Sequence, residues 1–246
     1  MGDIDTRVYT QPQYYELAFS FRDIPKEVDC FEECIRRFAR TPVHRVLELA
    51  CGPAPHLAEL TRRGFAYVGV DMSAEMLQYA ANQPAAGDTA VKFVQASMID
   101  FALKEPAHFV FVALGSLYAR STSDLACHLA SVSRALQPGG LYFLDWCIQF
   151  GGEVTGQAGG ECWQIERDGI RVRAQVTTAP VDRVEQLLEE TITLEIEDHS
   201  RTRTLTTTGL KRAIYPQEFL RVIEARRDFS FVGWWNNWDL ARVYHP

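Results

Sequence analysis

Apolar residues along the first 150 positions follow two alternating periods. Val28, Phe31, Ile35 and Phe38 repeat at helical spacing, which predicts an amphipathic helix over residues 26–40. Continuous apolar runs, typical of strands buried on both faces, occur at residues 43–49, 67–71, 91–95, 109–114 and 141–147. Helical stretches between these runs are predicted at residues 54–63, 73–82 and 123–137. Strands that alternate with helices predict an α/β domain with a parallel sheet covered on both faces.

The pattern changes after residue 150. Residues 162–178 and 184–208 alternate apolar with polar or β-branched residues, which is typical of antiparallel strands. Asp168 and Gly169 form a hairpin turn signal within the first of these stretches. Four glutamates of the second stretch are predicted to form its solvated face: Glu189, Glu190, Glu195 and Glu197. A helix over residues 216–225 and strands at residues 229–235 and 239–245 are predicted to close the chain.

Composition and charge exclude several classes of protein. Of the 246 residues, 47% are hydrophobic and 23% are charged, which excludes disordered, collagenous and coiled-coil chains. The net charge of −7 argues against a broad phosphate-binding face and therefore against a nucleic-acid partner. The longest clean apolar run, residues 109–114, is far shorter than the roughly 18 residues of a membrane helix, so no membrane partner is expected.

The first residues and the cysteines indicate the compartment. The chain starts with acidic residues where a secretory signal would carry positive charge and then an apolar stretch. The six cysteines contain no Cys-x-x-Cys pair and lie mostly within apolar segments. We therefore expect a cytoplasmic protein with free thiols and no metal site.

The turn after the first predicted strand has the composition of a nucleotide-binding turn. The strand reaches Glu48, and the small residues Ala50, Gly52 and Ala54 then lead into a helix. Doubly wound folds use such a turn to bring the backbone close to a nucleotide. Asp71, at the end of the second strand, lies 19 residues after Gly52, about the separation at which an acid accepts hydrogen bonds from ribose hydroxyls.

The charge beside this turn distinguishes two ligand classes. A dinucleotide site wants glycine at the third fingerprint position, which is Pro55 here. The carboxylate of Glu48 would repel a pyrophosphate by about 1–4 kcal/mol per charge at 4 Å. Glu48 favours a ligand with an ammonium or sulfonium group, and S-adenosylmethionine carries both, with a ribose for Asp71.

These residues resemble the first motif of the class I S-adenosylmethionine-dependent methyltransferases. The family motif runs acidic-x-Gly-x-Gly-x-Gly, and this chain has Glu48, Ala50, Gly52 and Ala54 at its positions. The resemblance covers most of residues 26–150. It implies a Rossmann-like, doubly wound seven-stranded sheet of order 3-2-1-4-5-7-6, with an inserted antiparallel β segment.

The resemblance also assigns cofactor residues at later strand ends. Asp71 would grip the ribose, Met72 would pack on adenine, and Met76 would approach adenine from the following helix. Ser97 replaces the acid that holds adenine after the third strand, and Leu114 lies in the loop after the fourth. The full implied set is Glu48, Ala50, Gly52, Asp71, Met72, Met76, Ser97, Met98 and Leu114.

Residues of the acceptor site are harder to identify, because a sulfonium donor requires neither a protein nucleophile nor a metal. Tyr14 and Tyr15 are candidates from an N-terminal segment that would close over the cofactor. Trp146 follows the fifth strand, and Arg212 and Tyr215 precede the last helix. Packing in the core is an equally good interpretation of each.

Three further features have two interpretations. Arg22 would pair with the methionine carboxylate or belong to an amphipathic helix. His56 is either a base at the site or a polar side chain near the cofactor. A tryptophan cluster would cage a cationic amine or fill the core, and its members are Trp234, Trp235 and Trp238.

The predicted function is therefore transfer of a methyl group from S-adenosylmethionine to an N, O or C atom of a small molecule, with S-adenosylhomocysteine as the product. The alternatives are a tRNA or protein methyltransferase and a non-catalytic, S-adenosylmethionine-binding regulatory protein. An alternative interpretation of the insertion is that it forms a homodimer interface. The expected single domain divides into an N-terminal lid and helix (1–40), a cofactor-binding core (41–150), an antiparallel insertion (151–212) and a closing helix and hairpin (213–246).

Overall fold

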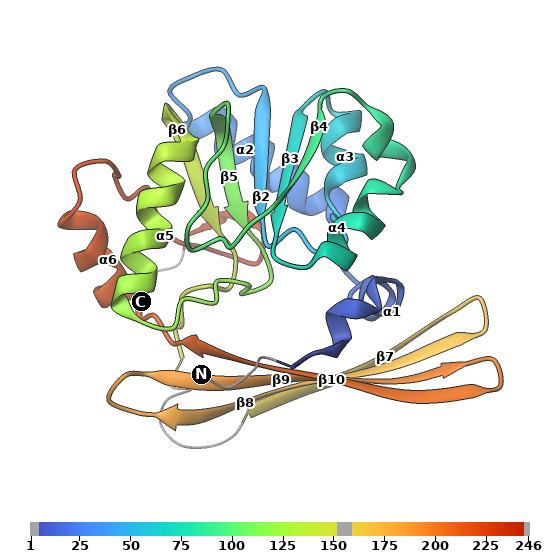
Figure 1. Ribbon diagram of the computed structural model, residues 1–246. Helices are drawn as coiled ribbons and strands as arrows, with labels where there is room; N and C mark the ends of the chain where they lie inside the picture. Colours follow the sequence, from blue (N-terminus) through green and yellow to red (C-terminus); the bar gives the residue numbers. More distant parts are fainter. Residues whose placement is uncertain (1–4, 152–158, 244–246) are drawn as a thin grey trace.

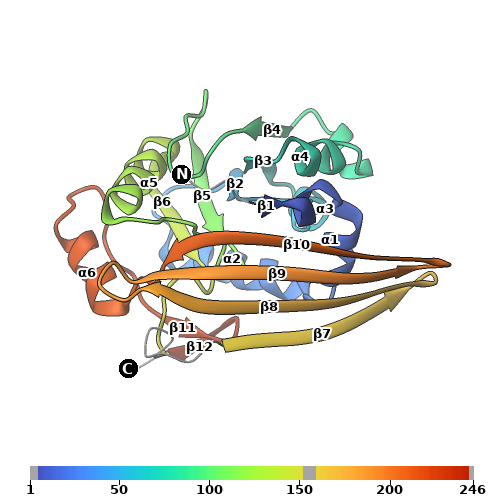
Figure 2. The same cartoon turned by 60° about the horizontal axis from the view of Figure 1, so that its bottom comes forward.

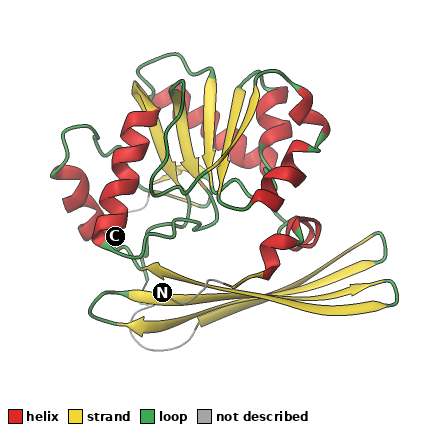
Figure 3. Cartoon of the chain, viewed as in Figure 1, coloured by secondary structure: helices red, strands yellow, loops and turns green. Residues whose placement is uncertain are grey.

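The computed structural model describes residues 5–151 and 159–243. An α/β core lies above a separate antiparallel sheet, and the N-terminal segment lies between the two (Figure 1). Figure 3 shows the same arrangement by element type, with helices confined to the core and to the N-terminal segment. No helix of the described residues is long and apolar enough to cross a membrane.

The core is a five-stranded parallel sheet of order β4-β3-β2-β5-β6. Its strands are β2 (Arg45–Leu49), β3 (Ala66–Asp71), β4 (Val91–Gln95), β5 (Ala107–Val112) and β6 (Leu136–Leu144). In chain order this is 3-2-1-4-5, so the predicted fold class and the order of its first five strands are confirmed.

Side chains of successive strand residues point to opposite faces of this sheet. Val110 and Val112 of β5 belong to one buried cluster, and Phe109 and Phe111 belong to another. Helices α5 (Thr122–Ala135) and α6 (Pro216–Glu224) cover the valine face. Helices α2 (Ile24–Phe38) and α3 (Leu57–Arg62) cover the phenylalanine face.

Helix starts follow the capping residues in the sequence. Ser73 caps α4 (Ala74–Ala81) by accepting from the backbone N–H of Met76 at 3.2 Å, as its position predicted. Ser121 caps α5 in the same way through the N–H of Asp124 at 3.0 Å. A short 3-10 turn, η2 (Pro84–Gly87), follows α4.

The second sheet, here called the roof, is antiparallel and has the order β1-β10-β9-β8-β7. Its strands are β1 (Asp5–Thr6), β7 (Gly159–Arg167), β8 (Ile170–Asp182), β9 (Leu187–Asp198) and β10 (Arg201–Arg212), seen from below in Figure 2. Asp168 (φ 54°) and Gly169 (φ 77°) form the predicted two-residue turn in left-handed conformation. The antiparallel insertion is therefore confirmed.

The N-terminal segment belongs to the roof, which the sequence did not predict. β1 pairs with β10, and the 3-10 helix η1 (Arg7–Thr10) and helix α1 (Pro12–Ala18) follow it. Val8 and Leu17 join the apolar cluster on the inner face of the roof, together with Ile192 and Leu194 of β9. The roof is thus built from two segments far apart in the sequence.

The predicted pairing of the last two strands with the core sheet is wrong in the described residues. β11 (Trp235–Asn236) and β12 (Asp239–Val243) form a separate two-stranded sheet, and residues 229–234 are not a strand. Ring packing holds this hairpin against the core instead: Trp235 lies 5.2 Å from Phe38, and Trp238 stacks on Phe143 at 5.7 Å between ring centroids.

Candidate functional site

A cavity of about 290 Å³ lies where β2 and β5 end, and residues of the core, of the N-terminal segment and Arg167 of the roof line it. Carboxyl ends of parallel strands are the edge at which open α/β sheets bind ligands. The turn after β2, the loop after β5, α1, the segment before α2 and the roof all contribute to its wall. Representative lining residues are Tyr15, Arg22, Ala50, Gly52, Leu114 and Arg167.

The turn after β2 has three residues in left-handed conformation: Ala50 (φ 52°), Gly52 (φ 52°) and Ala54 (φ 56°). A Cβ added to Gly52 would have no atom within 4 Å, so the backbone of this glycine is bare on that side. Ala50 and Gly52 also line the cavity. The alanines that replace the family glycines therefore keep the glycine conformation of the turn.

Replacing Ala50 by glycine is expected to stabilise the protein by about 0.5–1 kcal/mol. The left-handed conformation costs an alanine about 1–2 kcal/mol in the folded state, and glycine removes this cost. Glycine also gives the unfolded chain more conformational entropy, which offsets about 0.4–1 kcal/mol of the gain. Urea unfolding measures the difference. Ala58→Gly, on the exposed face of α3, is the control and should lose about 0.5–1 kcal/mol. Equal losses in both variants would contradict the expectation.

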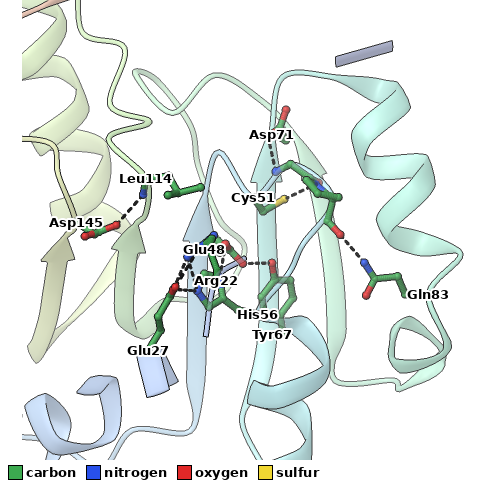
Figure 4. A network of polar contacts seen from close by, with 12 residues as sticks. Arg22, Glu27, Glu48, Cys51, His56, Tyr67, Asp71, Gln83, Leu114 and Asp145 are labelled. Atoms are coloured by element: carbon green, nitrogen blue, oxygen red, sulfur yellow. Dashed lines mark hydrogen bonds and ion pairs between the residues drawn. The ribbon is translucent and has the colours of Figure 1, made fainter. Parts of the chain in front are cut away.

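Asp71, at the end of β3, fastens this turn to the neighbouring strand. One carboxylate oxygen accepts from the N–H of Gly52 at 2.8 Å (Figure 4). The other accepts from the N–H of Ser73, also at 2.8 Å. Burial raises the pKa of Asp71 above its ordinary value, and the backbone N–H groups offset part of this effect. The N–H of Met72 also donates to this carboxylate, which still leaves it acceptor capacity for a ligand hydroxyl.

Glu48 belongs to a buried chain of polar contacts beside the cavity (Figure 4). It accepts from the hydroxyl of Tyr67 at 2.6 Å, and its other oxygen lies 2.7 Å from Nδ1 of His56. Nε2 of His56 lies 3.0 Å from a carboxylate oxygen of Glu27, which also binds the guanidinium of Arg22. Each oxygen of Glu48 thus has one partner within the protein, and Glu48 also lines the cavity, as predicted for a cofactor residue.

The charge state of His56 follows from its two carboxylate neighbours. Burial opposes the charged imidazolium, but Glu48 and Glu27 outweigh it and raise the pKa of His56. Both ring nitrogens then donate, one to each carboxylate. Because His56 is fully buried and bonded on both sides, it holds the network together and is not a base at the cavity.

One nitrogen of the Arg22 guanidinium remains available to a ligand. Its Nε and Nη2 atoms contact Glu27 and His56, whereas Nη1 has no hydrogen bond to any residue that the structure describes. Arg22 lines the cavity from the segment between α1 and α2. Its predicted pairing with a ligand carboxylate is compatible with this geometry and stays a prediction.

Leu114 lies in the loop after β5, as predicted, and lines the cavity in left-handed conformation (φ 54°). Its N–H donates to the carboxylate of Asp145 at 2.9 Å, which joins the ends of β5 and β6. Burial raises the pKa of Asp145 to about 6, and this N–H counteracts part of the shift.

The structure does not gather the predicted adenine contacts in the cavity. Met72 is 66% exposed at the end of β3, while Met76 and Met98 are buried in the interior. The hydroxyl of Ser97 accepts from the N–H of Ile99 at 3.2 Å. An adenine at this edge would meet the surface near Met72 and Ser97, and these contacts stay predictions.

Tyr14 and Tyr15 have different surroundings. Tyr15 lines the cavity, and its hydroxyl makes no hydrogen bond to residues of the described segments. Tyr14 instead donates to the carboxylate of Asp198 at 2.7 Å, and Arg203 lies 5.3 Å above its ring. Tyr14 therefore fastens α1 to the roof.

The remaining acceptor candidates lie outside the cavity wall. Arg212 is fully occupied by Glu218 at 2.6 Å, Gln186 at 2.9 Å and Thr122 at 3.1 Å, and so joins the roof to α5 and α6. Tyr215 stands at the start of α6, and Trp146 is 68% exposed. The tryptophans pack against other aromatic rings rather than forming a cage, through the pairs Trp234–Phe219, Trp235–Phe38 and Trp238–Phe143.

One polar cluster was not predicted from the sequence. Glu190, predicted to be solvated, lies on the inner face of the roof and binds the hydroxyl of Tyr118 and the ammonium of Lys211. The signal was present in the period of β9, because Leu188 and Ile192 face inward and Glu190 lies between them at the same parity.

Comparisons with known proteins agree with the fold and with the first motif. Residues 46–140 match the family model described as "Methyltransferase domain". "Putative methyltransferase YqeM" of Bacillus subtilis (strain 168) is 31% identical over 103 residues, which are 41% of this chain and 41% of that protein. The chain thus spans less than half of the length of this relative.

Two solved structures are similar over most of the chain. The sugar N-methyltransferase KedS8 from Streptoalloteichus sp ATCC 53650 has a TM-score of 0.69 and 23% identity, over 86% of this chain and 83% of its own. CalS10 from Micromonospora echinaspora, an amino pentose methyltransferase with S-adenosylmethionine bound, has a TM-score of 0.64 and 19% identity, over 86% of each chain. At these identities the likeness establishes a shared fold.

Proposed function

We propose that this chain, in which residues 46–140 form a methyltransferase domain, is an S-adenosylmethionine-dependent methyltransferase that acts on a small molecule. The observation that carries the proposal is the turn after β2. Its backbone is bare at Gly52, is tied to Asp71 and borders the cavity. A nucleoside with a charged side arm is the ligand that suits a close backbone, a carboxylate at the next strand end and a nearby guanidinium.

The residues present fit this cofactor. Asp71 would accept from the ribose hydroxyls, Met72 and Ser97 would border adenine, and Nη1 of Arg22 would pair with the methionine carboxylate. Glu48 lines the cavity as well, and through His56 and Glu27 it would hold Arg22 at the cavity wall. The bound cofactor supplies a methyl group that is already activated by a sulfonium.

The protein is then left with alignment and with the exclusion of water. Leu114 and Ser116 of the loop after β5 would position the acceptor, and Tyr15 and Phe19 of the N-terminal segment would cover the cavity from the roof side. Proximity and orientation of this kind supply about 7–11 kcal/mol of a reaction barrier. The target is an N, O or C atom of the acceptor. KedS8 is a sugar N-methyltransferase and CalS10 an amino pentose methyltransferase, which supports a sugar or amino sugar as the acceptor.

Calorimetric titration and a turnover assay test the proposal together. The folded chain should bind S-adenosylmethionine and S-adenosylhomocysteine and should methylate at least one member of a panel of sugars and amino sugars. The absence of heat with either nucleoside would overturn the proposal. Binding without turnover on any acceptor would favour the regulatory alternative instead.

A further inference from the structure

A largely desolvated ion pair interrupts the apolar inner face of the roof. Glu190 of β9 binds Lys211 of β10, and the side chains of both are only 12% exposed. The neighbouring inward positions of β9 hold Leu188 and Ile192, both buried. The hydroxyl of Tyr118 donates to the second oxygen of Glu190. One carboxylate therefore binds a phenol and an ammonium between two apolar inward positions of β9.

The backbone opposite Glu190 makes room for this arrangement. Gly209 is its partner on β10, and a Cβ there would lie 3.2 Å from Cε1 of Tyr118. The absence of a side chain at Gly209 leaves room for the ring of Tyr118, and the ammonium of Lys211 lies 5.8 Å from the centroid of that ring. Tyr118 is two residues from Ser116, which lines the cavity, so the cluster lies next to this part of the loop rather than in the cavity wall itself.

Two tyrosines of the N-terminal segment connect the cluster to the cavity. The ring of Tyr9 lies 5.7 Å from that of Tyr15, which lines the cavity. Burial raises the pKa of Tyr9 to about 12. The hydroxyl of Tyr118 lowers it in part, and the charges of Glu190 and Asp71 raise it further. Tyr9 therefore lies within electrostatic reach of both the roof carboxylate and the end of β3.

Fold stability alone does not explain this pair. Burying two charges costs desolvation, and well-packed apolar residues in place of a buried ion pair often leave stability unchanged or increase it. The pair does supply a set of donors and acceptors. Lys211 has three N–H groups, and each oxygen of Glu190 keeps a lone pair beyond its present contact. Hydroxyl groups, which both donate and accept, are the natural match for such a set.

We propose that Glu190 and Lys211, together with Tyr118, form a subsite that binds neighbouring hydroxyl groups of a sugar acceptor. The subsite determines which atom of the sugar faces the methyl group, so its residues govern specificity and take no proton themselves. This inference rests on the proposed function and deepens it. It assigns the acceptor to the roof side of the cavity, and the cofactor to the core side.

The test compares wild type with an apolar double variant, Glu190→Leu with Lys211→Leu, which the argument above expects to fold. The probes are D-glucose, D-glucosamine and their nucleoside diphosphate esters. Cyclohexanol and cyclohexylamine serve as ring counterparts without neighbouring hydroxyls. Calorimetry in the presence of S-adenosylhomocysteine gives each dissociation constant, and thermal unfolding checks the fold. Glu189→Gln, an exposed neighbour on the other face of β9, is the matched control.

We expect wild type to bind at least one sugar more tightly than the cyclohexyl compounds. In the double variant the dissociation constant of that sugar should rise about tenfold or more, because hydrogen bonds to charged groups are lost. Glu190→Gln keeps the shape of the side chain, so the dissociation constant of the sugar should rise by a smaller factor. The dissociation constant of S-adenosylhomocysteine should change less than about twofold in every variant, because the pair lies on the roof and not at the cofactor turn.

Two results would overturn the subsite: wild type that prefers no sugar over the cyclohexyl compounds, or a folded double variant that binds the sugar as well as wild type does. Both leave binding of S-adenosylhomocysteine intact. Loss of nucleoside binding in the wild type itself would instead contradict the proposed function.

Discussion

Replacing Asp71 by alanine is expected to weaken binding of S-adenosylmethionine and S-adenosylhomocysteine by about a hundredfold or more. Two hydrogen bonds from ribose hydroxyls to a carboxylate would be lost, and bonds to charged groups contribute about 1.5–3 kcal/mol each. The variant also frees the N–H of Gly52, which Asp71 holds at 2.8 Å, so the turn after β2 loses its tie to β3. Isothermal titration of wild type and variant with both nucleosides measures the effect.

Two companion variants separate the causes. Asp71→Asn keeps one acceptor oxygen but lacks the charge, and it should fall between wild type and Asp71→Ala. Glu75→Ala removes an equal charge from an exposed position four residues away, and should change the dissociation constants less than about twofold. A comparable loss in Glu75→Ala would show that general electrostatics, and not the ribose contact, governs affinity.

Replacing His56 by alanine is expected to destabilise the fold by about 3–5 kcal/mol, the usual result of removing one member of a buried ionic group. Glu48 and Glu27 would remain buried beside the cavity without the imidazolium between them. Urea unfolding at pH 6 gives the free-energy difference. A loss below about 1 kcal/mol would mean that the imidazolium does not bridge the two carboxylates.

The pH dependence gives a second readout, because the fold contains another buried histidine of opposite character. The pKa of His56 is raised, so its stabilisation is complete below about pH 6.5 and is lost as the pH rises through the folded-state pKa. Burial lowers the pKa of His128 to about 4, so its contribution is complete above about pH 6.5 and is lost as the pH falls toward 4.

A control with His128→Ala should therefore show the reverse trend. The free-energy difference from wild type should shrink at acid pH for His128→Ala, and above about pH 6.5 for His56→Ala. Parallel pH profiles in the two variants would contradict the charge states assigned to both histidines.

Much of the core could be predicted because local patterns determine it. Four successive residues of β5, from Phe109 to Val112, are fully buried, so a continuous apolar run was the right signal for a strand covered on both faces. The turn at Asp168 and Gly169 could also be predicted, because this pair of residues readily adopts the left-handed conformation that a two-residue hairpin turn needs. Contacts between distant segments were not readable. β1 pairs with β10 some 200 residues later, and no local pattern encodes that register.

The site was predicted in part for the same reason. The positions of Gly52, Asp71 and Leu114 follow from strand ends, and the structure places them there. The role of Glu48 depends on His56 and Glu27, whose proximity is a property of the tertiary structure. A sequence shows the charge of Glu48 but not its partners, and in the structure each oxygen binds one protein group while the residue also lines the cavity.

Because the roof is built from two distant segments, a chimera can change acceptor preference only if both segments are exchanged. Val8 donates to Thr207 at 2.9 Å, the indole of Trp163 donates to the carbonyl of Ala18 at 2.6 Å, and Tyr14 binds Asp198. A chimera that exchanges only the insertion would separate these pairs and leave the first helix without its matching surface. Recombination should therefore treat the N-terminal segment and the insertion as one cassette, and natural diversification of acceptors is expected to have changed both together.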